Sequence, residues 1–275
     1  SYMSYITEAI NKWGKCRTGA ITMYGAGVGV YGNSGYAYTG STPSKLKKRI
    51  EEANSSNAEI TDINITENGN YVIILGGSGY WTLGYPDAFL KKLEQYRTGD
   101  LRDDNILSAC FNDRGEWVVI TDKHYSYSNE TIKNFILKAE ELYEEVYYAY
   151  ITNYGMIACC KNGVYYKNIP SNLAEALKKL TFKPKVIKFT DNGLYLITDG
   201  ESQNYYFRFS SVGFNRLKNK LLAEYLRNRG NELATVQISA ICGAMLLNNF
   251  LYLQRYDNYS KNNACYRKAA SHLCK

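Results

Sequence analysis

The chain has 275 residues, of which 45% are hydrophobic and 21% are charged, and its formal net charge is +7. This composition excludes an intrinsically disordered chain, and the length suffices for one large domain or two small ones. No apolar run is long enough to span a membrane, since the most apolar stretch, Leu233 to Leu253, is interrupted by Gln237 and two asparagines. The 27 tyrosines and 22 glycines favour β-structure, because aromatic side chains suit a half-buried pleated surface.

A repeated unit is the main signal along the chain. The segment from Gly32 to Gly40 matches the segment from Gly76 to Gly84 at an offset of 44 residues, and a short apolar strand opened by a glycine turn precedes each. The same turn recurs with spacings of 44, 46, 40, 38 and 50 residues, close to the period of a propeller blade. The glycines of these turns are Gly25, Gly69, Gly115, Gly155, Gly193 and Gly243.

Each unit is predicted to contain three strands followed by a helix, and a short helix at Tyr5–Trp13, within residues 1–16, is predicted to cap the array. The chain is expected to be a single repeat domain over residues 1–275, with repeats at 20–55, 59–98, 105–145, 146–182, 185–230 and 233–275. In chain order, the predicted strands are Ala20–Tyr24, Val28–Tyr31, Tyr36–Thr39, Ile60–Ile65, Tyr71–Leu75, Tyr80–Leu83, Ile106–Phe111, Trp117–Thr121, Tyr125–Ser128, Tyr147–Ile151, Met156–Cys160, Val164–Lys167, Val186–Phe189, Leu194–Thr198, Tyr205–Phe209, Thr235–Ser239, Ala244–Leu247 and Leu251–Arg255. The predicted helices are Pro43–Ala53, Pro86–Tyr96, Glu130–Glu145, Ser171–Leu180, Val212–Asn228 and Ser260–Leu273.

The strand patterns predict how the units assemble. The second strand of each unit is the most apolar, as in Val72-Ile73-Ile74-Leu75, which suits a central strand; the first strand alternates, as in Ile60 to Ile65, which suits a strand lining a wet channel. One such unit cannot bury both faces of its sheet, so neighbours must stack. The sequence therefore predicts a mainly β, toroidal, propeller-like ring of about six three-stranded blades, each followed by an α-helix. An open β/α solenoid and a five-bladed α/β-propeller are the alternatives.

Two motifs carry a resemblance to a known class. Gly115 to Ile120 (Gly-x-Trp-Val-Val-Ile) and Gly77 to Trp81 (Gly-x-Gly-Tyr-Trp) resemble the repeats of bacterial β-propeller-like proteins with a helix per blade. The resemblance covers nearly the whole chain at the level of the fold and implies a blade-like unit. The Gly-His and Trp-Asp markers of WD40 repeats are missing from the sequence. The cyclic order of strands and helix also resembles the pentein-type α/β-propellers.

Residues that could carry chemistry are few. Seven cysteines without a C-x-x-C pair argue against a disulfide framework or a zinc site, and this slightly favours the cytoplasm over secretion, although a Cys16–Cys274 bridge would reverse that view. His124 is expected to be a solvated turn residue, and Cys159 and Cys160 are expected to be small core residues. Gly25 to Gly29 superficially matches a dinucleotide loop but aligns with the strand turn of the repeat. We therefore expect no catalytic residue, metal site or cofactor.

The recurring aromatic and basic residues are interpreted as structural in preference to ligand-binding. One tyrosine recurs at a fixed place in the unit and is expected to pack against the helix; its copies are Tyr36, Tyr80, Tyr125, Tyr165 and Tyr205 or Tyr206. Much of the positive charge lies on predicted amphipathic helices, where it forms a solvated outer face or, as an alternative, a surface for nucleic acid. These basic residues are Lys45, Lys47, Lys48, Lys91, Lys92, Lys178 and Lys179.

One face of the ring is the predicted binding surface. If strands alternate in direction, the first turns share a face with the helix starts, which include the candidate caps Asn129 and Ser171, and partners of repeat proteins bind such loop faces. The predicted function is a non-enzymatic binding or scaffold module for a protein or glycan partner. The alternatives are an α/β-propeller hydrolase or amidine-processing enzyme, and a nucleic-acid-associated protein. The candidate binding residues are Asn68, Asp113, Arg114, Tyr154, Asp191 and Asn192, with Glu67 and Asn153 on the same face.

Overall fold

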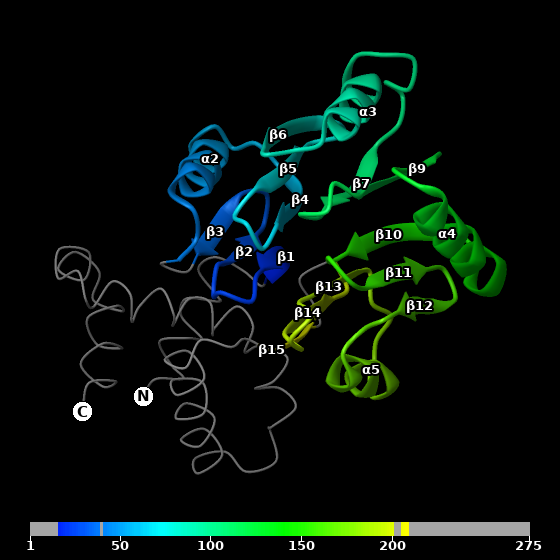
Figure 1. Cartoon of the computed structure of the whole chain (residues 1–275). Coiled ribbons are helices and arrows are strands. Elements are labelled where there is room, and N and C mark those ends of the chain that lie inside the picture. The colour runs from blue at the N-terminus through cyan, green and yellow to red at the C-terminus, as the bar shows by residue number, and fades with distance from the viewer. Residues whose placement is uncertain (1–15, 39–40, 201–204, 209–275) are drawn as a thin grey trace, which may run out of the picture.

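The computed structural model describes residues 16–38, 41–200 and 205–208 (Figure 1). This part of the chain is mainly β, with five separate three-stranded antiparallel sheets, each built from consecutive strands with the second strand in the centre. The strands are β1 Cys16–Ile21, β2 Gly27–Tyr31, β3 Gly35–Tyr38, β4 Ile60–Ile65, β5 Tyr71–Leu75, β6 Gly79–Leu83, β7 Ile106–Phe111, β8 Trp117–Thr121, β9 Tyr125–Tyr127, β10 Val146–Ile151, β11 Met156–Cys160, β12 Gly163–Lys167, β13 Val186–Phe189, β14 Tyr195–Thr198 and β15 Tyr205–Arg208. The helices that join one sheet to the next are α2 Ser44–Ser55, α3 Asp87–Arg97, α4 Glu130–Tyr143 and α5 Ser171–Lys178.

The predicted unit is confirmed for five sheets and four following helices. The central position of the second strand is also confirmed, since β5 pairs with both β4 and β6 and is buried over its first four residues. The first strand of the first unit was predicted as Ala20–Tyr24 but is Cys16–Ile21. It begins earlier because its pairing with β2 extends past the polar residues Arg17 and Thr18, and it ends earlier because the turn to β2 already includes Met23 and Tyr24. The predicted elements at 1–15 and 209–275, which include the sixth repeat and the capping helix, lie outside the described residues.

Glycine is required in the first hairpin turns of the units for two different physical reasons. At Gly69 the backbone has φ = +85°, a left-handed conformation that favours glycine. Gly155 has no such φ; instead, a β-carbon there would lie 2.4 Å from the carbonyl oxygen of Asn168, so the close approach of the chain requires glycine. The segment from Gly25 is likewise the turn between β1 and β2, as its alignment with the repeat predicted.

Each sheet contacts the next through its first strand. Strand β1 lies against β4, β4 against β7, β7 against β10 and β10 against β13, and the fifth sheet contacts the first through β13, β14 and β1. The hydroxyl of Thr198 on β14 donates a hydrogen bond of 3.2 Å to the carbonyl oxygen of Arg17 on β1. Residues of the first and last described units, far apart in the sequence, therefore lie side by side (Figure 1).

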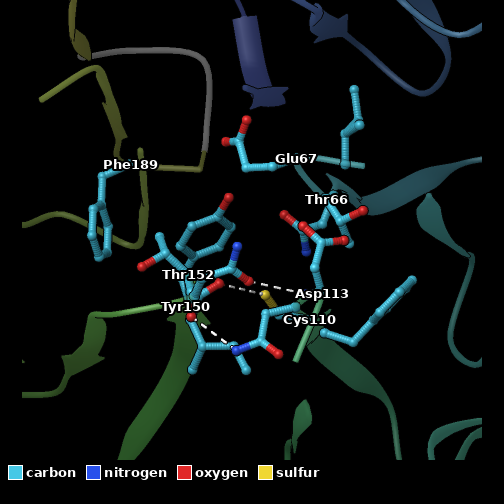
Figure 2. Close-up of a pocket in the computed structure, with 13 residues that line it drawn as sticks. Thr66, Glu67, Cys110, Asp113, Tyr150, Thr152 and Phe189 are labelled. Carbon is cyan, nitrogen blue, oxygen red and sulfur yellow. Dashed lines mark hydrogen bonds between the residues drawn. The ribbon is translucent and has the colours of Figure 1, made fainter. Parts of the chain in front are cut away.

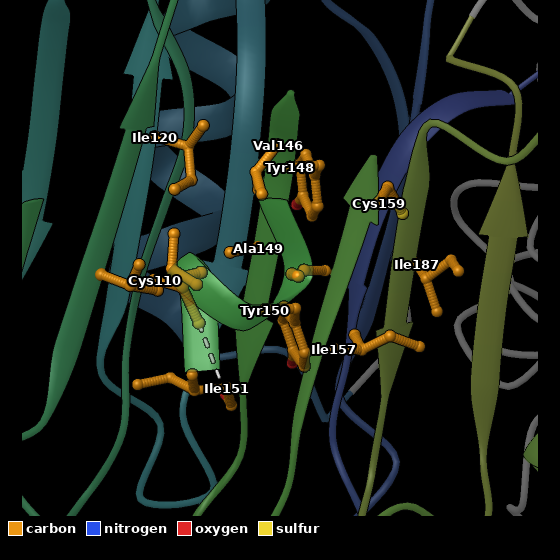
Figure 3. Close-up of a cluster of buried hydrophobic side chains, with 14 of the residues drawn as sticks. Cys110, Ile120, Val146, Tyr148, Ala149, Tyr150, Ile151, Ile157, Cys159 and Ile187 are labelled. Atoms are coloured by element: carbon orange, nitrogen blue, oxygen red, sulfur yellow. Dashed lines mark hydrogen bonds between the residues drawn. The ribbon is translucent and has the colours of Figure 1, made fainter. Parts of the chain in front are cut away.

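The interior between neighbouring sheets is mainly apolar, and its buried side chains form three clusters. On α3, Phe89 is fully buried and its ring lies 5.2 Å from the ring of Phe111 and 5.9 Å from that of Trp117. Around β10, the largest cluster of buried side chains joins the third, fourth and fifth units, as Figure 3 shows for Cys110, Tyr150 and Ile187. Burial of this apolar surface is what holds neighbouring units together.

The recurring tyrosines are placed in four of the described units. Tyr36, Tyr80, Tyr125 and Tyr165 are partly buried against the hydrophobic clusters. Tyr165 lies against the ring of Phe135 on α4 at 5.0 Å. The expectation that they pack against a helix is confirmed for Tyr165.

The first strands do not line a wet channel as predicted. Their polar side chains are buried, and Asp62 is only 1% exposed, Asn64 4% and Lys188 0%. A register shift at the start of β4 precedes Asp62, and such bulges change the direction of the side chains that follow. These polar groups form hydrogen bonds with one another and with backbone groups, because a buried polar group is costly without a hydrogen-bond partner.

The carboxylate of Asp62 accepts hydrogen bonds from residues of four units, its own included. The Oδ1 atom of Asp62 accepts a bond of 2.9 Å from the ammonium group of Lys188 on β13 and one of 2.8 Å from the hydroxyl of Tyr148 on β10. The Oδ2 atom accepts bonds of 3.1 Å from the backbone amide of Ala109 on β7 and from the side chain of Asn64. Burial and the charge of Asp62 raise the pKa of Tyr148, so its phenol stays protonated and donates. We call Asp62, Asn64, Tyr148 and Lys188 the central polar cluster.

None of the helices within the described ranges is both long enough and apolar enough to cross a membrane.

Candidate functional site

The turns between the first and second strands form the candidate site, and two consecutive positions in each turn behave differently. The residue directly before the turn glycine is exposed in all five described units. Tyr154 is the extreme case, with 71% of its surface exposed. The five exposed residues are Tyr24, Asn68, Arg114, Tyr154 and Asn192.

The preceding position ties each turn to its neighbour. The Glu67 carboxylate accepts the backbone N–H of Met23, and the Asp113 carboxylate accepts that of Asn68 at 3.3 Å. The side chain of Asn153 in turn accepts the N–H of Asp113 at 3.0 Å. Asp191 continues the series, since its carboxylate accepts the hydroxyl of Thr152 in the fourth unit at 2.6 Å.

These contacts divide the six predicted binding residues into two kinds. Asp113 and Asp191 link neighbouring turns, so their side chains hold the turn face in shape. Arg114 and Tyr154 are exposed and so are available to a partner, and the guanidinium of Arg114 also donates to the carbonyl oxygen of Asn153 in the next turn. Asn68 is exposed, and the side-chain oxygen of Asn192, which is also exposed, accepts the hydroxyl of Thr190.

The acidic residues of the turns influence one another. Burial raises the pKa of Glu67 above its ordinary value of 4.5, and the charges of Asp113 and Asp191 raise it further, against the lowering effect of the Met23 N–H. Burial also raises the pKa of Asp191. A small cavity of about 20 Å³ lies beside Glu67 and Asp113, between the turns and Tyr150 (Figure 2), with room for about one water molecule.

A larger cleft lies between the turns of the third and fourth units. Its volume is about 230 Å³, and its lining includes the exposed residues Arg114 and Tyr154. The structure thus brings together two of the predicted residues that come from different units, while Asp113 faces the small cavity. Other residues around the cleft are Asn112, Glu116, Asn153, Met156, Lys167 and Asn168.

Most of the backbone donors of the two turns are already occupied. The N–H groups of Arg114 and Glu116 each donate to the Asn112 side chain at 3.0 Å. In the next unit, the N–H groups of Tyr154 and Gly155 donate to the Thr152 hydroxyl at 3.3 and 2.8 Å. A ligand in the cleft must therefore be recognised mainly by side chains.

The start of α4 lies at the same cleft, which confirms for this unit that a helix start and the first turns share a face. Asn129 caps this helix as predicted, since its side chain accepts the N–H of Ile132 at 2.9 Å and donates to Glu116 at 3.0 Å. Ser171 is not a cap. It is the first residue of α5, the capping position is Pro170, and no side-chain bond is made there.

Three of the described cysteines are unsuited to nucleophilic catalysis. Cys110, Cys159 and Cys160 are buried free thiols, which confirms the expectation that Cys159 and Cys160 are core residues. Burial raises the pKa of Cys110 to about 12 and that of Cys160 to about 11, and it raises the pKa of Cys159 as well. The thiols are therefore protonated near neutral pH, whereas a nucleophilic cysteine must be a thiolate. Cys242, Cys265 and Cys274 lie outside the described residues.

The contact of His124 with a buried carboxylate was not predicted from the sequence. The residue does lie in the turn before β9 and is half-exposed, but its Nδ1 atom is 2.5 Å from a carboxylate oxygen of the buried Asp104. Asp104 also accepts the hydroxyl of Thr121 at 2.7 Å. The described residues include no cluster of three or more histidine, cysteine or acidic side chains that could hold a metal ion.

The chain matches no protein-family model. The search of curated proteins likewise finds no match. The case for function therefore depends on the geometry of the turn face.

Proposed function

We propose that this chain is a non-enzymatic binding module, arranged as a propeller-like ring, that uses its turn face to hold a protein or glycan partner. Contact of each first strand with the next, and of β13 and β14 with β1, supports a ring made by the described units. Each unit in such a ring presents the same turn on the same side, so side chains from several units can meet one ligand.

The observation that carries this proposal is the cleft of about 230 Å³ between the turns of two units. Such concave sites with a few convergent polar groups are the usual form of a ligand site. Exposed Arg and Tyr side chains are also the residue types that most often dominate binding energy. Arg114 and Tyr154 contribute both features to the same cleft.

The two alternative functions have less support. An enzyme of the α/β-propeller kind would need an activated nucleophile, and the described thiols have raised pKa values. A nucleic-acid surface would need a concentration of unpaired positive charge, whereas some of the basic residues on the outer helices pair with acidic neighbours three residues away, as in Arg49 with Glu52 and Lys178 with Glu175.

Binding to arrays of glycans and of peptides tests the proposal. The full chain is compared with the variant Arg114→Ala/Tyr154→Ala and with a control, Arg97→Ala/Leu142→Ala, that removes one exposed arginine and one large exposed side chain from the helices. We expect the wild type and the control to bind the same ligands and the cleft variant to lose them. Equal binding by the cleft variant, or no ligand on either array, would refute the proposal.

A further inference from the structure

The charges around the cleft favour an anionic ligand. Arg114 and Lys167 line it from neighbouring units, and within the described part of the chain Glu116 is the one acidic residue of its lining. The Glu116 carboxylate accepts hydrogen bonds from the side chains of Asn112 and Asn129, both at 3.0 Å, so its charge is partly offset. The cleft therefore carries an excess of one positive charge.

The guanidinium of Arg114 is held at the wall of the cleft before any ligand binds. Its Nη1 atom donates 3.2 Å to the carbonyl oxygen of Asn153, and its Nε atom lies 3.8 Å from Glu116. The guanidinium has five donors, so donors remain for a ligand, and its planar fork matches a carboxylate in two parallel bonds. A side chain that is already placed loses less entropy on binding.

The rest of the wall suits a compact ligand with both apolar and hydroxyl surface. Tyr154 offers an exposed aromatic ring, Met156 an apolar side chain, and Asn153 and Asn168 offer amide groups. An aromatic face packs against the C–H face of a sugar, and amides both donate to and accept from hydroxyls. With about 230 Å³, the cleft is below the usual size of a drug-like pocket and fits one ring-sized group.

The occupied backbone donors argue against a peptide ligand held by its main chain or by its terminal carboxylate. Such peptides are recognised through main-chain bonds to a strand edge, or through a nest of backbone N–H groups around the carboxylate. At this cleft, the N–H groups of Arg114, Tyr154 and Gly155 are bound by side chains of their own turns. Side-chain recognition of a sugar needs none of them.

We propose that the cleft binds an acidic sugar residue, with its carboxylate on Arg114 and Lys167 and its ring against Tyr154. This inference rests on the proposed binding function and names the ligand class for the same site.

Pairs of ligands that differ only in the carboxylate test it. Methyl glucuronide and methyl galacturonide are titrated into the full chain alongside methyl glucoside and methyl galactoside, and binding is followed by ligand-observed NMR. We expect at least one acidic glycoside to bind about tenfold more tightly than its neutral parent, which is the size of one charge-assisted contact. Its affinity should fall as salt is added.

Matched variants separate charge from packing. Arg114→Gln and Lys167→Gln should each weaken the acidic glycoside severalfold and leave the neutral one unchanged, while Tyr154→Ala weakens both. The control Lys161→Gln removes a lysine from the turn at the other end of the β11–β12 hairpin and should change neither.

Each outcome decides between the two claims. Equal affinity for acidic and neutral sugars would overturn the charge inference and leave the binding function intact. Binding of a peptide that ends in a free carboxylate, with no acidic sugar bound, would also overturn the inference while supporting a protein partner. If no glycoside and no peptide binds and the arrays are also silent, both proposals fail.

Discussion

Removing the positive charge at the centre of the molecule should be among the most destabilising single changes in the described part of the chain. Lys188→Met keeps the length and apolar stem of the side chain but leaves the Asp62 carboxylate, 1% exposed, without its cation. Breaking a buried ion pair by removing one partner costs about 3–5 kcal/mol. Tyr148→Phe removes one hydrogen bond to the same charged group and should cost about 1.5–3 kcal/mol.

The double variant tests the reasoning more sharply than either single change. Asp62→Asn alone leaves Lys188 charged and buried, whereas Asp62→Asn/Lys188→Met removes both charges. Because the second change relieves the cost of the first, the double variant should lose less stability than the sum of the single variants, by about 2 kcal/mol or more. The carbonyl oxygen of Ile63, which accepts from Lys188, would then need another donor.

Urea unfolding followed by circular dichroism at neutral pH provides the free energies. If Lys188→Met does not fold, Tyr148→Phe and its combination with Asp62→Asn give a second cycle around the same carboxylate. Losses that add to within about 0.5 kcal/mol would show that the groups are not coupled, and the account of the central polar cluster would then be wrong.

Three further predictions concern the turn face and the helix starts. Because the pKa of Glu67 is raised, the stability that its protonated form contributes is present below its ordinary pKa and is lost as the pH rises. Glu67→Gln should therefore raise the melting temperature relative to wild type more at pH 7 than at pH 4. A difference in melting temperature that does not change with pH would contradict this. Asn129→Ala should cost about 0.5–2 kcal/mol in urea unfolding through loss of the cap, and Ser171→Ala, where no cap bond exists, should cost close to nothing. Gly155→Ala should cost about 1–3 kcal/mol, because the added carbon meets the Asn168 carbonyl at 2.4 Å and the chain must shift; an unchanged midpoint would show that the turn yields without cost.

The strands and turns of each unit could be predicted from the sequence. Strands such as Ile60–Ile65 and Trp117–Thr121 are predicted with their observed bounds, because alternation, apolar runs and turn glycines are all short-range signals. The recurrence of the unit places these signals five times within the described residues, so an error in one copy is corrected by the others. The predicted start of β1 is wrong because polar residues such as Arg17 belong to the strand but precede its apolar run.

Contacts between units could not be predicted from the sequence in the same way. Asp62 and Lys188 are 126 residues apart in the sequence. The alternation of polar and apolar residues predicts on which side of its strand each side chain lies, but it does not predict which residue it contacts. A polar residue on the inner side of a first strand is compatible with water or with a buried partner. The choice depends on how closely the strands approach, which is set by the assembled units.

The candidate site was predicted in part. Arg114 and Tyr154 were chosen because they lie in equivalent turns, and the structure places both at one cleft. Lys167 and Met156 were missed, since one ends β12 and the other begins β11, and neither residue type is unusual in a strand. The separation of linking residues such as Asp113 from exposed ones such as Tyr154 required the hydrogen bonds between turns.

The methyl groups of methionine allow the most direct test of where a ligand binds. The chain has four methionines, and two of them, Met23 and Met156, lie at turns of different units on the proposed binding face. In protein labelled with ¹³C at the methionine methyls and assigned through Met156→Leu, titration with the acidic glycoside should shift the Met156 signal and leave that of Met23 in place. A shift of Met23 with Met156 unchanged would place the ligand elsewhere and contradict the assignment of the cleft.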